Sequence, residues 1–327
     1  MNFPRNTFPG NTPIRIFRYN IPHHLETFRK EILQIHLENV RNKKLDPAIK
    51  YVIGGNSIKI PYSNEKKQIV IQELYLTFVW CVTYFMLIVF EGAIAKKMRE
   101  DQWVGEFKFD TPLLLNAYKL FVWALSLTQN ISAWSLDLPN PEKPNNEEEK
   151  YWVEKVNGIF LDAVINNILH EYAHIVNGHF RYLKNILKKN ISELTDEEKS
   201  TRIEIENEAD NFARELLVKN SDSEKYKMQK GLALIISHIA PLFIYTDPKS
   251  LRQEVHPDID VRIINALEYL NFEREILKDY LLGITTFSLK VFLNYHRIDI
   301  SVEPQKPGEL LMIYLKKIEE VKNYDRN

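Results

Sequence analysis

The sequence has little of three things that would narrow its function at once: cysteine, net charge and long apolar runs. Cys81 is the only cysteine among 327 residues, so neither an intrachain disulfide nor a cluster of thiolate metal ligands can form. Lysine and arginine number 43 against 44 aspartate and glutamate residues, whereas a dedicated nucleic-acid-binding protein usually carries a clear basic excess. We therefore expect a protein of a reducing, intracellular compartment that does not bind nucleic acid.

The most basic local segment is residues 181–189, RYLKNILKK. Such a segment is either a nucleic-acid-binding patch or the solvated face of a helix, and the second is far more common. We therefore interpret it as a solvated surface.

One apolar run bears on the location of the protein. Residues 74–90 carry no charge and are only just long enough to span a bilayer. A buried core helix is the alternative, and we prefer it because the run is short and apolar on all sides. The N-terminus, MNFPRNTFPGNTP, has proline and asparagine where a signal peptide requires an apolar run. The expected location is the cytoplasm, with association with the inner membrane as the alternative.

The clearest break in the chain is residues 137–150, which combine three prolines with a run of charges. We interpret this segment as an exposed loop. It separates an N-terminal helical region, residues 1–136, from a C-terminal region, residues 151–327. The N-terminal region is the candidate for recognition of a substrate or an activator.

Periodicity predicts a mainly α protein with one small β-hairpin. The hairpin is expected over residues 51–61, around a turn at Gly54-Gly55-Asn56. The first 20 residues are expected to form an extended arm, Gly178 to cap a helix end and Pro257 to begin a helix. Thr195 and Glu198 have the spacing of a capping box. Helices are predicted over residues 25–40, 68–97, 112–134, 151–177 and 308–321.

The strongest chemical signal is His170-Glu171-Tyr172-Ala173-His174, an H-E-x-x-H motif in a helical stretch. Histidines four residues apart lie on one face of a helix, so both imidazoles can bind one metal ion. Glu171 is rotated by about 100° around the helix and cannot easily bind the same ion. It can instead act as a general base on a water that Zn²⁺ activates.

A catalytic zinc site usually has a third protein ligand, and Glu206 is the candidate. Glu206 and Asp210 lie on one face of a predicted helix, so Glu206 can bind the metal while Asp210 holds a ligand histidine by a hydrogen bond. Ala209 and Ala213 would let this helix approach the motif helix closely. Glu208 is the competing ligand, but it should face away from Glu206.

These residues together resemble those of known zinc peptidases. Two histidines with a downstream glutamate are similar to the gluzincin arrangement. Glu206 to Asp210, E-x-x-A-D, and residues 256–263, HPDIDVRI, resemble elements of HtpX-type metallopeptidases. The stretch HEYAHIVNGH, residues 170–179, resembles the phage-exclusion Lit-type peptidases, as does the absence of several clear membrane spans.

The resemblance implies a fold and a function for the C-terminal region. It implies a zincin-like helical core in residues 151–327 and a zinc-dependent endopeptidase with a specific intracellular protein substrate. The Lit-type resemblance implies cleavage of a translation elongation factor, elongation factor Tu, during phage infection, by a latent enzyme that a phage-derived component activates. Two other functions stay open: a membrane-associated HtpX-like quality-control peptidase, and a regulatory protein whose zinc site is non-catalytic.

Three further residues have more than one interpretation. His256 is a candidate to stabilise the oxyanion of the tetrahedral intermediate, or is simply the residue before a helix. Arg262 pairs with a buried carboxylate such as Asp210 or lies on the surface. His179 hydrogen-bonds substrate or a ligand, or is an exposed or capping histidine just beyond the end of the motif helix.

Overall fold

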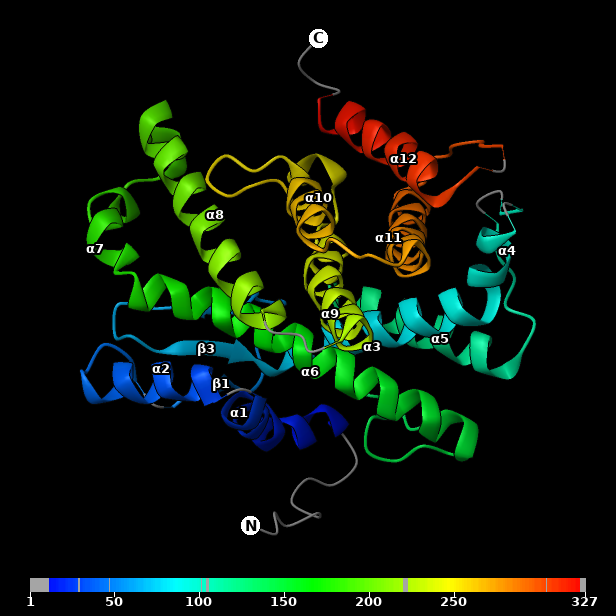
Figure 1. The fold of residues 1–327 in the computed structure, drawn as a ribbon, viewed down its shortest axis with the longest axis horizontal. Helices are drawn as coiled ribbons and strands as arrows, with labels where there is room; N and C mark the ends of the chain where they lie inside the picture. The colour runs from blue at the N-terminus through cyan, green and yellow to red at the C-terminus, as the bar shows by residue number, and fades with distance from the viewer. Residues whose placement is uncertain are drawn as a thin grey trace.

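The computed structural model describes residues 12–28, 30–46, 48–100, 102–103, 106–219, 223–303 and 305–323. Over these residues the chain is mainly α with one small sheet, which confirms the predicted fold class (Figure 1). The helices are α1 (Phe17–Phe28), α2 (Lys30–Arg41), α3 (Glu73–Val89), α4 (Ala95–Arg99), α5 (Pro112–Ser126), α6 (Glu147–Val176), α7 (His179–Leu183), α8 (Asp196–Val218), α9 (Glu224–Leu242), α10 (Ile259–Tyr269), α11 (Glu275–Tyr295) and α12 (Pro307–Lys322). The strands are β1 (Lys50–Val52), β2 (Tyr62–Ser63) and β3 (Ile69–Gln72).

The long helix α6 runs through the middle of the structure and contacts most of the other layers. It packs against α8 and α9 on one side and against α3 and α1 on the others (Figure 1). Its N-terminus is fixed by Asn146, whose side chain accepts a hydrogen bond from the Glu149 backbone, and by acidic residues in the first turn. The helix begins at Glu147, four residues inside the segment that the sequence predicts to be a loop.

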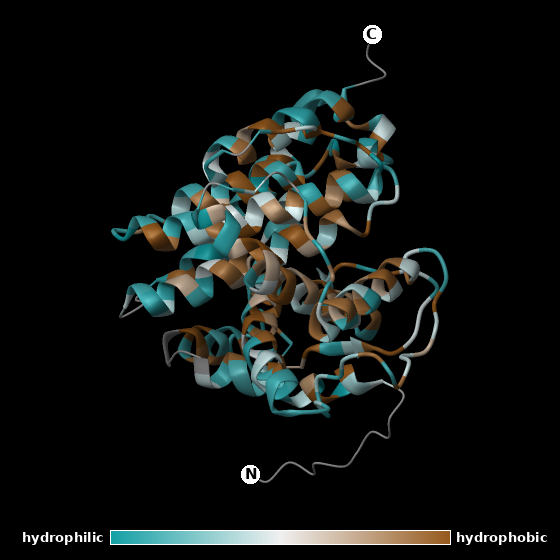
Figure 2. Ribbon diagram, turned by 90° about the vertical axis from the view of Figure 1, so that its right-hand side faces the viewer, coloured by the Kyte–Doolittle hydropathy of each residue, from teal (hydrophilic) through white to brown (hydrophobic). Residues whose placement is uncertain are grey.

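Helix α3 is buried over almost its whole length. Every residue from Tyr75 to Val89 is buried, and the hydrophobic stretches of the chain gather where the helices meet (Figure 2). Residues 73–99 form the one helical segment of the described chain that is long and apolar enough to cross a membrane, and 83% of its apolar window is buried inside the protein. The apolar run of residues 74–90 is therefore a core helix in this structure.

The sheet has the order β1-β3-β2, with β1 parallel to β3 and β2 antiparallel to it. The buried strand β3 takes the central position because all four of its residues are buried. A tight turn connects β2 to β3: the Asn64 backbone accepts from Lys67, which has a φ of 64°. The small hairpin of this protein is therefore β2–β3.

The predicted hairpin over residues 51–61 is wrong. Gly54 and Gly55 do turn the chain, with positive φ angles, but the segment that follows them does not pair with β1. It is held instead by the buried side chain of Gln72, which donates to the carbonyls of Gly54 and Ser57 and accepts from the Lys59 backbone. A side chain takes the place of the expected backbone ladder.

Two other boundaries near the N-terminus differ from the prediction. Residues 1–11 lie outside the described residues, but residues 13–16 form a 3-10 turn and α1 begins at Phe17, so the end of the predicted arm is helical. The predicted helix over residues 25–40 is divided between α1 and α2. By contrast, α12 confirms the predicted C-terminal helix with one extra residue at each end.

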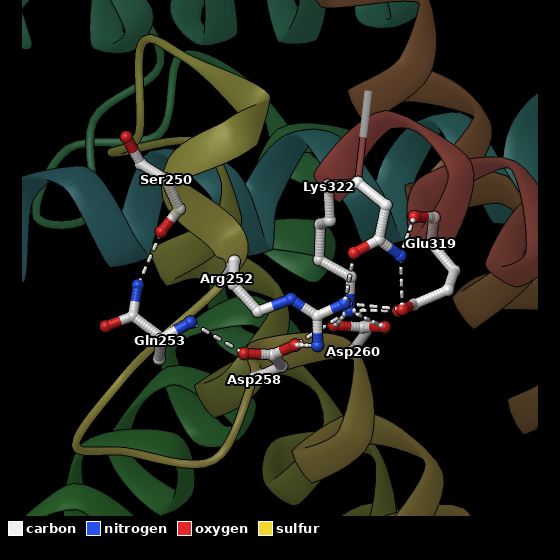
Figure 3. A network of polar contacts seen from close by, with 8 residues as sticks. Ser250, Arg252, Gln253, Asp258, Asp260, Glu319 and Lys322 are labelled. Atoms are coloured by element: carbon white, nitrogen blue, oxygen red, sulfur yellow. Dashed lines mark hydrogen bonds and ion pairs between the residues drawn. The ribbon is translucent and has the colours of Figure 1, made fainter. Parts of the chain in front are cut away.

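A buried ionic network joins α12 to the first turn of α10 and to the segment before it (Figure 3). Lys322, with only 1% of its side chain exposed, contacts Asp258 Oδ2 at 2.9 Å and Asp260 Oδ2 at 2.8 Å. Arg252 contacts Asp258 Oδ2 at 3.0 Å, and the Gln253 backbone donates to the other oxygen of Asp258. Every carboxylate in the network is thus paired, as burial requires. The network fixes the chain on both sides of His256.

We expect Lys322→Met to lower the free energy of unfolding by about 3–5 kcal/mol, because it leaves the buried Asp260 carboxylate without its counterion and Asp258 with Arg252 alone. Denaturant unfolding at neutral pH measures this loss. Lys316→Met, at an exposed position of the same helix, is the control and should change the value by less than about 0.5 kcal/mol. Equal unfolding midpoints for the two variants would show that the network adds no stability.

Candidate metal centre

The H-E-x-x-H motif occupies the last turns of α6, where the helix end is well defined. His170 and His174 are both buried. The helix ends at Val176, and Gly178 follows in the left-handed conformation, with a φ of 74° and a ψ of 26°, as the sequence predicts for a capping glycine. The turn at Gly178 directs the chain into α7, which begins at His179.

Helix α8 supplies the second half of the site. The predicted capping box is confirmed: the Thr195 side chain accepts from the Glu198 backbone, and the Glu198 side chain accepts from the Thr195 backbone. Ala209 and Ala213 are almost completely buried, and α8 packs against both α6 and α9. Small side chains on a buried helix face allow a neighbouring helix to approach closely.

His170, His174 and Glu206 converge on one point. A ligand atom of each lies within 4.8 Å of the others. The Nε2 atoms of the two histidines are 3.2 Å apart, and Glu206 oxygens lie 3.3 Å from His170 Nε2 and 3.6 Å from His174 Nε2. Two imidazole nitrogens and one carboxylate are the donor set of many catalytic zinc sites.

Asp210 lies on the far side of His170, and Arg262 lies behind Asp210. Asp210 Oδ1 is 2.8 Å from His170 Nδ1, and Arg262 donates from two nitrogens to the Asp210 carboxylate. A bidentate pair of this kind fixes the carboxylate plane. Of the two interpretations of Arg262, the structure supports the buried pair: only 23% of its side chain is exposed.

The charges of this cluster favour a cation at its centre. Burial alone lowers the pKa of His170, but the carboxylates of Asp210 and Glu206 outweigh it and raise the pKa to about 10. Burial opposes ionisation of Glu206, but hydrogen bonds with His170, His174 and His256 hold its pKa well below the usual range. Arg262 and His170 do the same for the pKa of Asp210. A metal has to displace the Nε2 proton of His170 before it can bind there. With Nδ1 engaged by Asp210, the lone pair then freed on Nε2 faces the centre of the cluster.

The residues present therefore fit a divalent metal such as Zn²⁺. The donors are the nitrogens and the carboxylate that zinc prefers, and the paired Asp210 supplies the outer hydrogen bond that orients a histidine ligand. Glu208 does not take part as a ligand: its side chain is 58% exposed. Its oxygens contact Asn177 and His179 instead.

His256 lies beside the third candidate ligand. Its Nδ1 atom is 3.2 Å from Glu206 Oε2, and 43% of its side chain is exposed. The structure thus brings His256 to the site as predicted, in contact with a carboxylate. Pro257 does not begin the next helix; α10 begins at Ile259, with Asp258 as its N-cap.

Glu171 is held by a residue that sequence reasoning missed. Both the backbone nitrogen and the hydroxyl of Ser63 donate to Glu171 Oε2, at 2.6 and 2.8 Å. Asn64 N donates to Gln68 O in the β2–β3 ladder, so the neighbouring Ser63 N–H points away from β3, toward α6. The other oxygen, Oε1, lies 4.0 Å from His170 Nε2. Nothing in the sequence indicates this contact, because the two residues are 108 positions apart.

Other candidate residues occupy less direct positions. Tyr172 turns away from the metal ligands and accepts a hydrogen bond from Asn39. His238 is buried on α9, and burial, with the charge of Arg262, lowers its pKa to about 3. Tyr182 is 72% exposed, within the basic segment of residues 181–189, most of whose side chains are exposed or half-buried.

His238 makes stability depend on pH in a defined direction. Its pKa is about 3 in the folded protein and about 6.5 in an unfolded chain. As the pH falls below 6.5, only the unfolded state takes up this proton, so the group destabilises the fold by about 2 kcal/mol between pH 6.5 and 5. Between pH 6.5 and 5, the free energy of unfolding of His238→Gln should therefore fall by about 2 kcal/mol less than that of the wild type. Identical pH slopes for variant and wild type in denaturant titrations would contradict the assignment.

Comparison with known proteins identifies the family. Residues 69–282, well over half of the chain, match the sequence model of Peptidase U49, the family of Lit and Lit-like peptidases. The match includes all of α6, α8 and α10, and it confirms the Lit-type resemblance at the level of the family. A search of curated proteins and a search of solved structures each found no match. The chain therefore belongs to the Peptidase U49 family and is a peptidase.

Proposed function

We propose that this peptidase is a zinc-dependent endopeptidase, with His170, His174 and Glu206 as metal ligands and Glu171 as general base. The observation that carries the proposal is the convergence of the three donor groups within 4.8 Å. The Glu171 carboxylate lies beside them. A structural metal site needs ligands but has no use for a base at this position.

The chain's own residues account for the steps of peptide hydrolysis. Zinc, when bound, supplies a Lewis acid that polarises the scissile carbonyl and makes water a better nucleophile. Ser63 holds Glu171 Oε2, which leaves Oε1 on the side of His170. Glu171 accepts a proton from the attacking water and passes it to the amine that leaves, so that one carboxylate serves both proton transfers.

His256 is assigned to the oxyanion of the tetrahedral intermediate. Its Nδ1 faces Glu206 Oε2, so a hydrogen bond from this nitrogen also orients the ligand carboxylate. The second ring nitrogen donates to substrate only when the ring carries both protons. The assignment therefore requires the imidazolium form of His256 during catalysis.

Family membership supports a narrow range of substrates and partners. We propose that the substrate is an intracellular protein, with elongation factor Tu as the candidate. A phage-derived component is the candidate activator. These assignments rest on the Lit-type family relationship. The proposed location is the cytoplasm, with no nucleic-acid partner.

One long apolar segment is the observation that favours a second candidate function. Residues 73–99 are long and apolar enough to cross a membrane, although most of this segment is buried in the protein. A membrane-associated quality-control peptidase would use this segment as an anchor. Such a role requires α3 to leave its contacts with α5, α6 and α9, at the cost of exposing a large apolar core.

The zinc and base assignments are tested together with Glu171→Gln. We expect the purified variant to bind one Zn²⁺ per chain like the wild type and to lose at least about 100-fold in peptide hydrolysis, because a carboxamide cannot accept the proton. N-terminal proteomics of bacterial cells expressing either form, with and without phage infection, would identify the substrate. Glu148→Gln, on an exposed position of the same helix, is the control. Cleavage that survives in Glu171→Gln would refute the base assignment, and a wild-type protein without zinc would refute the metal.

Centrifugation of lysed cells distinguishes a cytoplasmic protein from a membrane-associated one. For a cytoplasmic enzyme, we expect the protein to stay in the supernatant when lysed cells are centrifuged at high speed, and any pelleted fraction to be released by alkaline carbonate. Protein retained in the membrane after that treatment would support the membrane-associated alternative.

A further inference from the structure

The Nδ1 atom of His174, which faces away from the candidate metal position, lies against a second histidine. His170 Nδ1 faces a carboxylate, Asp210, whereas His174 Nδ1 faces a second histidine: its distance to His179 Nδ1 is 2.9 Å. His179 is 2% exposed, so this contact is shielded from water. The two rings stand nearly perpendicular, with centroids 5.0 Å apart.

The local backbone explains how His179 reaches this position. A continuous helix would carry residue 179 around the axis, away from residue 174. Gly178 instead adopts a φ of 74°, which most residues with a side chain avoid. The chain therefore turns back at the end of α6, and the first residue of α7 packs against His174.

Hydrogen-bond chemistry allows only one arrangement of protons along this contact when His174 binds a metal. His174 Nε2 is the atom that faces His170 and Glu206, so it must offer a lone pair, and the ring proton is on Nδ1. His179 Nδ1 must then accept that proton. In a neutral ring, this leaves the proton of His179 on Nε2.

A carboxylate lies close to the nitrogen that carries that last proton. His179 Nε2 is buried, finds no hydrogen-bond partner among the described residues and lies 3.5 Å from Glu208 Oε2. The other oxygen of Glu208 accepts a hydrogen bond from Asn177 at 2.9 Å, which keeps this exposed carboxylate at the end of α6. Glu208 comes from the same helix as Glu206, so the ligand and the outer carboxylate are positioned together.

We propose that His179 is a positioning residue for the metal ligand His174, in a relay that runs from His174 through His179 to Glu208. His179 Nδ1 accepts a hydrogen bond from the Nδ1–H of His174, and this bond fixes the orientation and the tautomer of that ligand. Glu208 orients His179 in turn. The relay rests on the proposed metal site and gives His174 the outer support that Asp210 gives His170. His179 is not itself a ligand of that metal, because it contacts the side of His174 that faces away from it.

The experiment measures zinc affinity and needs no substrate. Purified full-length protein is stripped of metal, and the zinc dissociation constant is measured by competition with a chromophoric chelator. We expect His179→Phe, which removes both nitrogens from a ring of similar size, to raise the constant about 10- to 100-fold. Glu208→Gln, at an exposed position, should raise it by a smaller factor, roughly 3- to 10-fold. The absorption spectrum of the Co²⁺-loaded protein should change in both variants.

The double variant separates a relay from independent effects. Because Glu208 acts through His179, adding Glu208→Gln to His179→Phe should cause no further loss of zinc affinity. The matched control is Glu204→Gln, which is exposed on the same helix one turn earlier and should leave the affinity unchanged. Circular dichroism and thermal melting of the metal-free proteins establish that each variant is folded.

Each outcome decides the proposal. A folded His179→Phe that binds zinc with the wild-type affinity would overturn the relay. So would a Glu208→Gln substitution that lowers zinc affinity by the same factor in the wild type and in His179→Phe. If His179→Phe does not fold, Glu208→Gln decides alone: a wild-type affinity and Co²⁺ spectrum in that variant overturn the relay. A wild-type protein that binds no zinc would refute the proposed metal site itself, and the relay with it.

Discussion

The approach of α8 to the C-terminal half of α6 is the contact on which the candidate site depends. Ala209 and Ala213 are buried on α8, and side chains of this size on a packed helix face allow a neighbouring helix to lie close. A larger residue would force the helices apart, because a packed interior adjusts only partly to added volume. All the acidic side chains of α8 that contact a motif histidine would then move together. The alanines carry no chemistry, but the spacing of the donor atoms follows from them.

The sequence allowed the prediction of features that depend on neighbours a few residues away. The H-E-x-x-H spacing, the Thr195–Glu198 capping box and the Gly178 helix end all belong to this class, since one helical turn determines each of them. The hairpin at residues 51–61 was predicted from the same kind of local signal and was wrong. Its glycines do turn the chain, but the strand partner was decided by the burial of β3 and by the side chain of Gln72, which no local pattern reveals.

The site also depends on the chain before the loop at residues 137–150. Ser63, on the edge strand β2, holds Glu171, the proposed general base. Tyr75, on α3, accepts a hydrogen bond from Asn167 one turn before the motif. Because elements from both sides of the loop contribute to one hydrophobic core, the N-terminal part contributes directly to the geometry of the site. The division into a recognition region and a peptidase region stays a prediction.

The two candidate histidine ligands are held by different means, and this difference has a physical reason. His170 lies between Glu206 and the Asp210–Arg262 pair, where the guanidinium balances one of two buried carboxylates. A second carboxylate behind His174 would add another negative charge to the same small volume, and burying an unpaired charge is costly. A neutral imidazole accepts the His174 proton without adding charge, and it moves the balancing carboxylate, Glu208, outward to a position where water solvates it. The structure thus orients both histidines while keeping the excess negative charge at the point where Glu206 and Glu171 face them, which is where a dication would be bound.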